Sequence, residues 1–164
     1  MLHIMKVKNA DVLSVMPPQY GLFGLLFAFM NRLQTVGDSF YEEITCKQFF
    51  LLACLNLYPD EPPTANELAE TMGCTRQNVK QLLDSLCKKE ILVLIQDKND
   101  KRKQRIHRTK KCERLAANYT QKEQEFMQLL YNGVSENEIL SVFKTITKME
   151  NNLKDFGQKS AFNS

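Results

Sequence analysis

The segment TANELAETMGCTRQNVKQLLDSL (64–86) has the signals of two helices joined by a short turn. Thr64 and Glu67 match the capping box that starts a helix, in which each side chain bonds the other residue's backbone. Gly73 suits the left-handed position that ends a helix, and Thr75 can cap the next one. Two helices that share a short glycine-containing turn predict a helix-turn-helix, although an ordinary helical hairpin with a polar face has the same pattern.

The second of these helices would present a polar surface at its N-terminal end. Val79 would pack against Ala69 of the first helix, so the residues around Val79 would point outward. Arginine suits the hydrogen-bonding edge of guanine, and asparagine or glutamine suits that of adenine. The candidate DNA contacts on the two helices are Thr64, Thr75, Arg76, Gln77, Asn78, Lys80 and Gln81.

The residues after the two helices predict a short hairpin with a basic tip. The run ILVLIQ (91–96) is rich in β-branched residues and predicts a strand, beside which residues 105–109 could return. Asn99 and Asp100 occupy the expected tip. A helix-turn-helix followed by such a hairpin is a winged helix. Its second helix enters the major groove, and the hairpin, or wing, crosses phosphates or reaches the minor groove.

Positive charge is concentrated in the same part of the chain. Residues 75–114 contain 13 of the 22 Lys and Arg residues but only 5 of the 19 Asp and Glu residues. A basic block on an otherwise acidic chain indicates a polyanion partner such as double-stranded DNA, although a solvated cationic face would have the same charge. The wing candidates for DNA contact are Lys98, Asp100, Lys101, Arg102, Lys103 and Arg105, with His107 and Arg108 farther along the return strand.

A resemblance to the MarR family of bacterial transcriptional regulators covers about residues 60–112. It lies in the run ELAETMGCTRQNVKQLLDSLCKKEILV, followed by DKNDKRKQRIHRTKK. The resemblance includes the wing signature of that family, which Asp97, Asp100 and Arg102 meet. It implies that Arg102 inserts into the minor groove while Asp100 orients it. Arg108 departs from the family pattern, in which an apolar residue is usual at this position.

Apolar residues at alternating steps of three and four mark one helix near each end of the chain. The two seams are Leu22, Leu26, Phe29, Leu33, Val36 and Phe40, and Ile139, Val142, Ile146, Met149, Leu153 and Phe156. A winged-helix core is too small to bury both seams, so we expect them to pair with those of a second copy in a homodimer. Packing of the two helices on each other is the alternative.

These features predict a mainly α fold with a small β-hairpin, in which a winged helix-turn-helix core is flanked by N- and C-terminal dimerisation helices. The expected divisions are an N-terminal arm and dimerisation helix (1–44), the DNA-binding domain (45–112) and the C-terminal dimerisation helices (113–164). A symmetric dimer implies a pseudo-palindromic operator with half-sites about one helical turn apart.

The resemblance also implies a small lipophilic or phenolic effector, bound between the dimerisation helices and the winged domain. The residues expected to line that region are Phe23, Phe27, Phe49, Phe50 and Leu52. Aromatic residues at helical spacing also suit a hydrophobic core, and both interpretations remain open at this point.

Five widely spaced cysteines argue against a disulfide scaffold and against a zinc site. Cys46, Cys54, Cys74, Cys87 and Cys112 form no CxxC pair, so we expect reduced structural thiols. Some members of the family that the chain resembles sense oxidants through one cysteine. Cys74, close to Arg76, is the best electrostatic candidate for such a role, and Cys112 has cationic neighbours as well.

The sequence has no nucleophile elbow, phosphate loop, metal-ligand spacing or glycine-rich cofactor turn. We therefore expect neither an enzyme nor a bound metal or cofactor. The apolar segment 20–30 is shorter than the ~20 residues that span a bilayer, which indicates a cytoplasmic protein without membrane contact. The sequence thus predicts a dimeric DNA-binding regulator, most simply a repressor. A winged-helix module that binds a protein and a thiol-based redox regulator are the alternatives.

Overall fold

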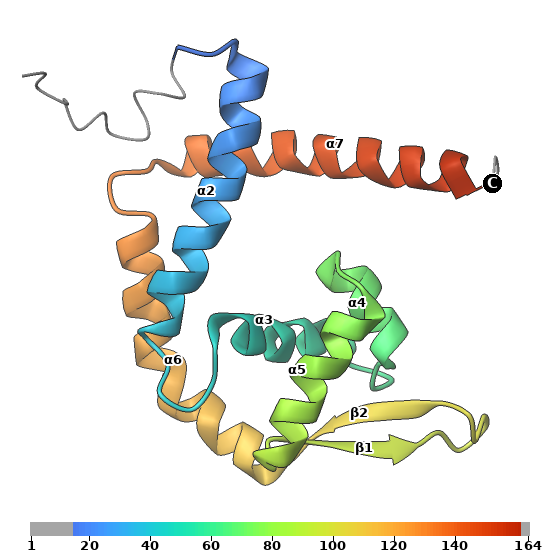
Figure 1. Ribbon diagram of the computed structural model, residues 1–164. Coiled ribbons are helices and arrows are strands. Elements are labelled where there is room, and N and C mark those ends of the chain that lie inside the picture. Colours follow the sequence, from blue (N-terminus) through green and yellow to red (C-terminus); the bar gives the residue numbers. More distant parts are fainter. Residues whose placement is uncertain (1–14, 162–164) are drawn as a thin grey trace, which may run out of the picture. The chain divides into compact units, whose positions relative to one another are not determined.

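The computed structural model describes residues 15–161, with side chains described up to residue 157. The chain divides into two compact units after Glu123, and each unit is described by itself. The elements are α2 (Pro18–Asp38), α3 (Cys46–Cys54), the 3-10 turn η1 (Leu55–Leu57), α4 (Ala65–Met72), α5 (Arg76–Lys88), β1 (Leu92–Gln96), β2 (Gln104–Arg108), α6 (Lys110–Leu130) and α7 (Glu136–Ala161) (Figure 1). The predicted fold class, mainly helical with one small hairpin and a winged helix-turn-helix core, is confirmed.

Helices α4 and α5 form the predicted helix-turn-helix. The Thr64 amide donates to Glu67 Oε2 at 2.6 Å, and the Glu67 amide donates to Thr64 Oγ1, which completes the capping box. Gly73 ends α4 at a φ of 63°, a left-handed conformation that favours glycine. The Thr75 hydroxyl accepts from the Asn78 amide at 3.2 Å and so caps α5. The sequence signals for both helix ends are therefore confirmed.

The core of the first unit lies where α3, α4, α5 and the hairpin meet. Val79 and Leu86 of α5 are fully buried, as are Leu51 of α3 and Leu68 of α4. Because an α-helix repeats every 3.6 residues, the inward position of Val79 turns its neighbours on α5 toward solvent. The burial of this one residue thus orients the polar face that the sequence analysis identified.

Strands β1 and β2 form an antiparallel hairpin that extends from the end of α5 (Figure 1). Leu92 pairs with Arg108, and Gln96 pairs with Gln104. Strand β1 therefore starts one residue later than predicted, and β2 starts one residue earlier. The amide of Ile106 donates to the carbonyl of Pro63 at 2.9 Å. The segment before α4 therefore continues the hydrogen bonding along the open edge of β2.

Helix α6 begins at Lys110, five residues before Leu115, the first leucine of the helix. The Thr109 hydroxyl donates to the Glu90 carbonyl at 2.7 Å and accepts from the Cys112 amide at 3.3 Å. Thr109 therefore has two roles, because it ends the hairpin and also caps α6. Two lysines open the helix, although positive charge is unfavourable at a helix N-terminus.

One tyrosine of α6 fastens the loop between α2 and α3. The Tyr119 hydroxyl accepts from the amides of Glu42 and Glu43 at 3.2 and 3.0 Å. Its buried ring packs edge-to-face on Tyr41, with centroids 5.1 Å apart. Burial is the main cause that raises the pKa of Tyr41 to about 12, so that ring is neutral at physiological pH.

Replacing Tyr119 with phenylalanine leaves two partly buried amides without an acceptor. We expect a loss of about 1–3 kcal/mol in the free energy of unfolding, the cost of unsatisfied buried donors. Denaturant unfolding followed by circular dichroism measures it. Tyr131→Phe is the matched control, because Tyr131 is exposed and its removal should cost little. Equal losses in the two variants would contradict the fastening role of Tyr119.

The second unit contains the end of α6 and helix α7. The Ser135 amide donates to Glu138 Oε2 at 2.8 Å, and the Glu138 amide donates to the Ser135 hydroxyl, which forms a capping box at the start of α7. Gly133 has a φ of 76° in the turn before it. None of the described helices has both the length and the apolarity to cross a membrane.

Candidate nucleic-acid interface

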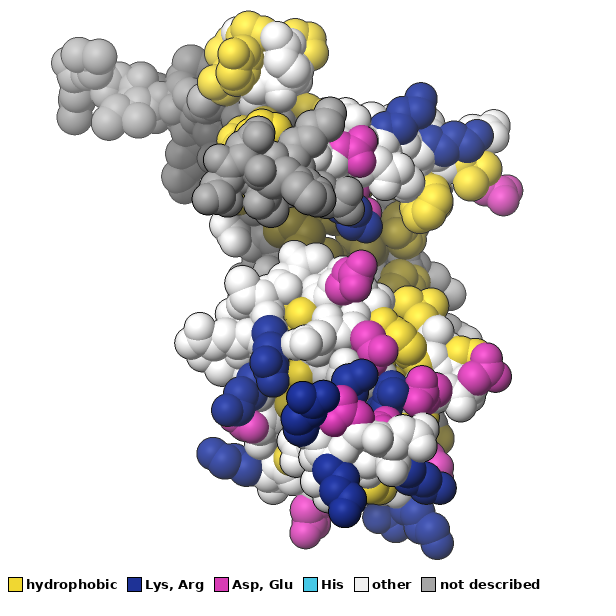
Figure 2. Space-filling view, turned by 90° about the vertical axis from the view of Figure 1, so that its right-hand side faces the viewer, with side chains coloured by type: hydrophobic (Ala, Val, Ile, Leu, Met, Phe, Trp, Pro, Cys, Tyr) yellow, Lys and Arg dark blue, Asp and Glu magenta, His cyan; other side chains and the backbone are white. Residues whose placement is uncertain are grey.

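The outer face of α5 presents the polar side chains that are predicted from the sequence to contact DNA. Arg76, Gln77, Asn78, Lys80 and Gln81 are all exposed, while Val79 between them is fully buried. Figure 2 shows one side of this unit, where lysine and arginine side chains lie among aspartate and glutamate side chains. An exposed, mostly polar helix surface with positive charge around it has the chemistry needed to contact a nucleic acid.

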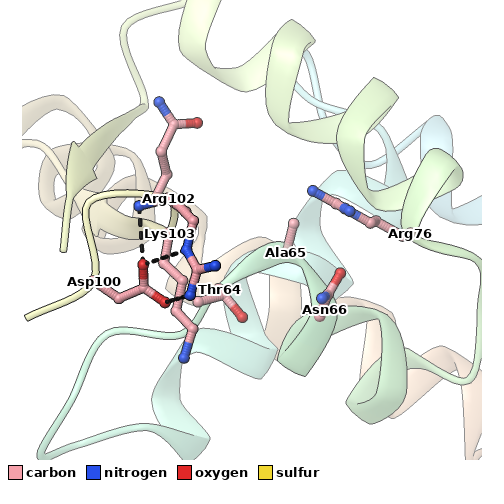
Figure 3. A pocket seen from close by; sticks show the side chains of 8 residues that line it. Thr64, Ala65, Asn66, Arg76, Asp100, Arg102 and Lys103 are labelled. Carbon is pink, nitrogen blue, oxygen red and sulfur yellow. Dashed lines mark hydrogen bonds and ion pairs between the residues drawn. The ribbon is translucent and has the colours of Figure 1, made fainter.

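At the wing tip, the carboxylate of one aspartate binds the guanidinium of one arginine. Arg102 Nε lies 3.1 Å from Asp100 Oδ1, and Nη2 of the same guanidinium lies 3.4 Å from Oδ2 (Figure 3). The Arg102 amide also donates to Asp100 Oδ1, at 3.1 Å. These bonds lower the pKa of Asp100, the side chain of Arg102 being the largest cause. The Arg102 side chain is nevertheless 92% exposed, so Asp100 orients it without covering it.

A hollow of about 500 Å³ lies between the wing and the first turns of α4 and α5. Its lining residues are Thr64, Ala65, Asn66, Arg76, Asp100, Arg102, Lys103 and Gln104 (Figure 3). Five of them are predicted DNA contacts, and the structure brings these together from three separate segments. Asn66 and Gln104 were missed. The signal that could have found them is position, because Asn66 lies two residues after the cap residue Thr64 and Gln104 lies just before the predicted return strand.

Arg105, one of the DNA contacts predicted from the sequence, differs from the exposed cations of the wing because its side chain is largely buried. Its side chain is 14% exposed and its nitrogens lie 2.6 Å from Asp97 Oδ2, 2.7 Å from Glu61 Oε1 and 3.5 Å from Glu67 Oε2. Nη1 also donates to the Pro62 carbonyl at 3.0 Å. A guanidinium enclosed by three carboxylates is occupied by protein partners.

Arg108 is a second cation of the basic run that bonds to other parts of the protein. Its Nη2 donates to Asn56 Oδ1 at 2.6 Å and to the Leu52 carbonyl at 3.3 Å, at the end of α3. A cation near the carbonyl end of a helix is favourable because that end carries partial negative charge. The polar residue at this position therefore links β2 to α3.

Asp97 shapes the wing from its base. Its Oδ1 accepts from the amides of Asn99 and Asp100 at 2.8 Å each, while Oδ2 accepts from Arg105. These bonds lower the pKa of Asp97 to about 2, and the bond from Arg105 is the largest cause. A depressed pKa means that the stabilisation is present above the ordinary pKa of an aspartate and is lost as pH falls through about 2. Asp97 is therefore fully ionised at neutral pH.

Comparison with known proteins identifies the winged unit. Residues 44–103 match the model of the MarR family. The chain carries a MarR-family domain. No curated protein matches the chain significantly.

Solved structures agree with this assignment over most of the chain. The Staphylococcus aureus MepR–DNA complex is 25% identical, with a TM-score of 0.69, over 78% of this chain and 95% of that one. A MarR/EmrR family transcriptional regulator from Acinetobacter sp. ADP1 is 15% identical, with a TM-score of 0.74, over 85% and 99%. PcaV from Streptomyces coelicolor, solved with its natural ligand, is 18% identical, with a TM-score of 0.68, over 90% and 98%. The fold is thus that of MarR-family transcriptional regulators.

The aromatic residues predicted to line an effector site fall into two groups around this MarR-family domain. Phe49 and Leu52 pack against the core, and the Phe49 ring stacks on Tyr41 at a centroid distance of 4.7 Å. Phe23 and Phe27 of α2 are exposed, with their rings edge-to-face at 5.1 Å, and Phe50 is exposed as well. The core interpretation therefore holds for Phe49 and Leu52, and an effector site stays a prediction.

The five thiols of the chain are free, and they differ in burial. None of the five cysteines forms a disulfide, and Cys54 and Cys112 are buried. Burial raises the pKa of the thiols of Cys46, Cys54, Cys87 and Cys112, which lowers their reactivity at neutral pH. Within the described residues, no cluster of His, Cys, Asp and Glu side chains could hold a metal ion.

Proposed function

We propose that the chain is a sequence-specific DNA-binding transcriptional regulator that acts as a homodimer on a pseudo-palindromic operator. The observation that carries this proposal is the Asp100–Arg102 pair, which projects from the wing beside the exposed polar face of α5. Support comes from the MarR-family domain and from the likeness to MepR, whose structure was solved with DNA. Repression is the simplest mode, because a bound dimer occupies DNA that the transcription machinery needs.

Each part of the interface has its own task in this proposal. The α5 side chains Gln77 and Asn78 would read base edges in the major groove, where each base pair presents a distinct pattern of donors and acceptors. Arg102 would enter the minor groove, where the potential is strongly negative. The exposed wing lysines Lys98, Lys101 and Lys103 would contact phosphates and make the affinity depend steeply on salt.

The homodimer is proposed from the apolar side chains that the single chain leaves uncovered. On α2 these include Phe23, Phe27 and Met30, and on α7 they include Val142, Ile146 and Leu153. Exposed apolar surface of this extent marks an interaction site, and a two-fold interface between identical copies is the commonest way to cover it. We place the working dimer in the cytoplasm, with access to DNA.

A small lipophilic or phenolic effector is the proposed signal. Support comes from PcaV, which has this fold and was solved with its natural ligand. Such an effector would act by binding more tightly to a dimer whose two α5 helices are misplaced for DNA, because a ligand shifts an equilibrium only by its differential affinity. The redox alternative is not favoured at Cys112, whose thiol is buried and has a pKa raised by that burial, and Cys74 stays the candidate for such a role.

Selection from a random duplex library tests the proposal directly. The parent protein should enrich a pseudo-palindrome whose half-sites lie about one helical turn apart. Gln77→Ala should relax the sequence preference at one base pair of each half-site. The accompanying loss of affinity should be smaller than the loss of this preference. Glu70→Gln is the control, because Glu70 is exposed on α4 and is not among the base-reading residues. Sequences no different from the input library would contradict a sequence-specific regulator.

A further inference from the structure

Arg105 stands at the centre of an ion cluster between the wing and α4. Its three carboxylate partners come from three segments, with Asp97 at the base of the wing, Glu61 in the loop before α4 and Glu67 in the first turn of α4. We call these four residues the wing latch. Three carboxylates around one guanidinium leave the latch with net negative charge, so it repels a phosphate rather than binding one.

The wing latch continues into the wing tip through hydrogen bonds. Asp97 holds Arg105 with one carboxylate oxygen and the amide of Asp100 with the other, at 2.6 and 2.8 Å. Asp100 in turn holds the guanidinium of Arg102. At the other end, Glu67 caps α4 and thereby fixes the turn that bears Thr64. A continuous set of bonds therefore joins the cap of α4 to the exposed arginine of the wing.

A two-stranded hairpin has little stability of its own, so its direction depends on what holds it to the rest of the unit. We propose that the wing latch sets the position of Arg102 relative to α5, with Arg105 as a positioning residue that does not touch DNA. This rests on the proposed function and adds to it a requirement on residues outside the contact surface. A bidentate guanidinium at Arg105 is needed, because a lysine ammonium cannot bridge carboxylates from three segments in this way.

Asp97→Asn separates this proposal from simple electrostatics. The change removes a negative charge beside the DNA face, which by charge alone strengthens DNA binding. The wing latch predicts the opposite, about tenfold weaker binding, the size of one lost arginine contact. Glu70→Gln removes the same charge from α4 and is the matched control, for which binding should be equal or slightly tighter. Tighter binding by Asp97→Asn would overturn the proposal.

Arg105→Gln tests the link to Arg102 in a double-mutant cycle. In the parent background it should weaken binding by about tenfold, and in an Arg102→Ala background it should weaken binding by less than about twofold. Arg105→Lys keeps the charge but should still lose most of the affinity. Equal effects of Arg105→Gln in both backgrounds, or parent affinity for Arg105→Lys, would show that Arg105 contacts a phosphate itself.

Amide hydrogen exchange, measured on the protein without DNA, tests the wing latch independently of whether the protein binds DNA. Arg105→Gln should speed exchange of the amides of Asn99, Asp100 and Arg102 while the amides of α5 keep parent rates. Unchanged rates in the wing would overturn the wing latch even if the parent binds its operator. Faster exchange in the wing, combined with a parent that binds no DNA, would leave the latch intact as a structural device but would overturn its role in positioning a DNA contact.

Discussion

Arg102→Ala is expected to weaken operator binding by about 5- to 150-fold, which corresponds to about 1–3 kcal/mol for one specific arginine contact. The physical reason is geometric, because Asp100 holds the guanidinium in one orientation and so reduces the conformational entropy lost on binding. The Arg102 side chain is almost fully exposed, so its removal should leave thermal stability unchanged. Fluorescence anisotropy with operator DNA measures the affinity, and circular dichroism measures the melting temperature.

Lys98→Ala is the matched control for Arg102→Ala. Lys98 is exposed in the same loop, and as a phosphate contact its loss should weaken binding equally on all sequences and reduce the salt slope by about 1. Arg102→Ala should also reduce the preference for operator over scrambled DNA, if Arg102 responds to the width of the minor groove. An Arg102→Ala variant with parent affinity would show that the wing does not reach DNA as proposed.

The double variant Ile146→Glu with Leu153→Glu should convert the dimer into monomers. Both side chains are exposed on the chain alone, and their spacing of seven puts them on the same face of α7. A buried, unpaired carboxylate is strongly unfavourable in an apolar interface. A monomer would meet one half-site only, so operator affinity should fall by at least about a hundredfold. Light scattering coupled to size exclusion gives the mass, and anisotropy gives the affinity.

Lys144→Glu provides the control for the dimer variant. It changes the net charge by the same amount, but at 100° per residue Lys144 lies on the side of α7 opposite the seam. It should remain dimeric and should bind with an affinity close to that of the parent. A double variant that stays dimeric would show that this face of α7 does not form the interface. A monomer with undiminished affinity would show that the dimer is not needed for DNA recognition.

The helix-turn-helix and the wing motif could be predicted because their signals are local. Thr64 with Glu67, Gly73 and Thr75 each satisfy a backbone requirement within four residues of themselves, and the structure shows these bonds. The pairing of Asp100 with Arg102 is equally local, being a bond between residues two apart. Such features need no knowledge of the rest of the fold.

The roles of Arg105 and Arg108 could not be predicted, because most of their partners are distant in the sequence. Arg105 bonds to Pro62, 43 residues earlier, and Arg108 bonds to Asn56, 52 residues earlier. A run of cations predicts an exposed basic surface, and nothing within the run distinguishes the two arginines that bond to other parts of the protein. The distinction comes from the loop before α4, which lies along β2 and brings carboxylates to it.

The measurement that tests the central claim most directly is fluorescence anisotropy with the DNA upstream of the protein's own gene. A scrambled duplex of the same length and composition is titrated beside it over a range of salt concentrations. We expect tighter binding to the upstream DNA, with an affinity that falls steeply as salt rises. Failure to bind either duplex even at low salt would contradict a DNA-binding regulator and would favour a winged-helix module whose partner is a protein.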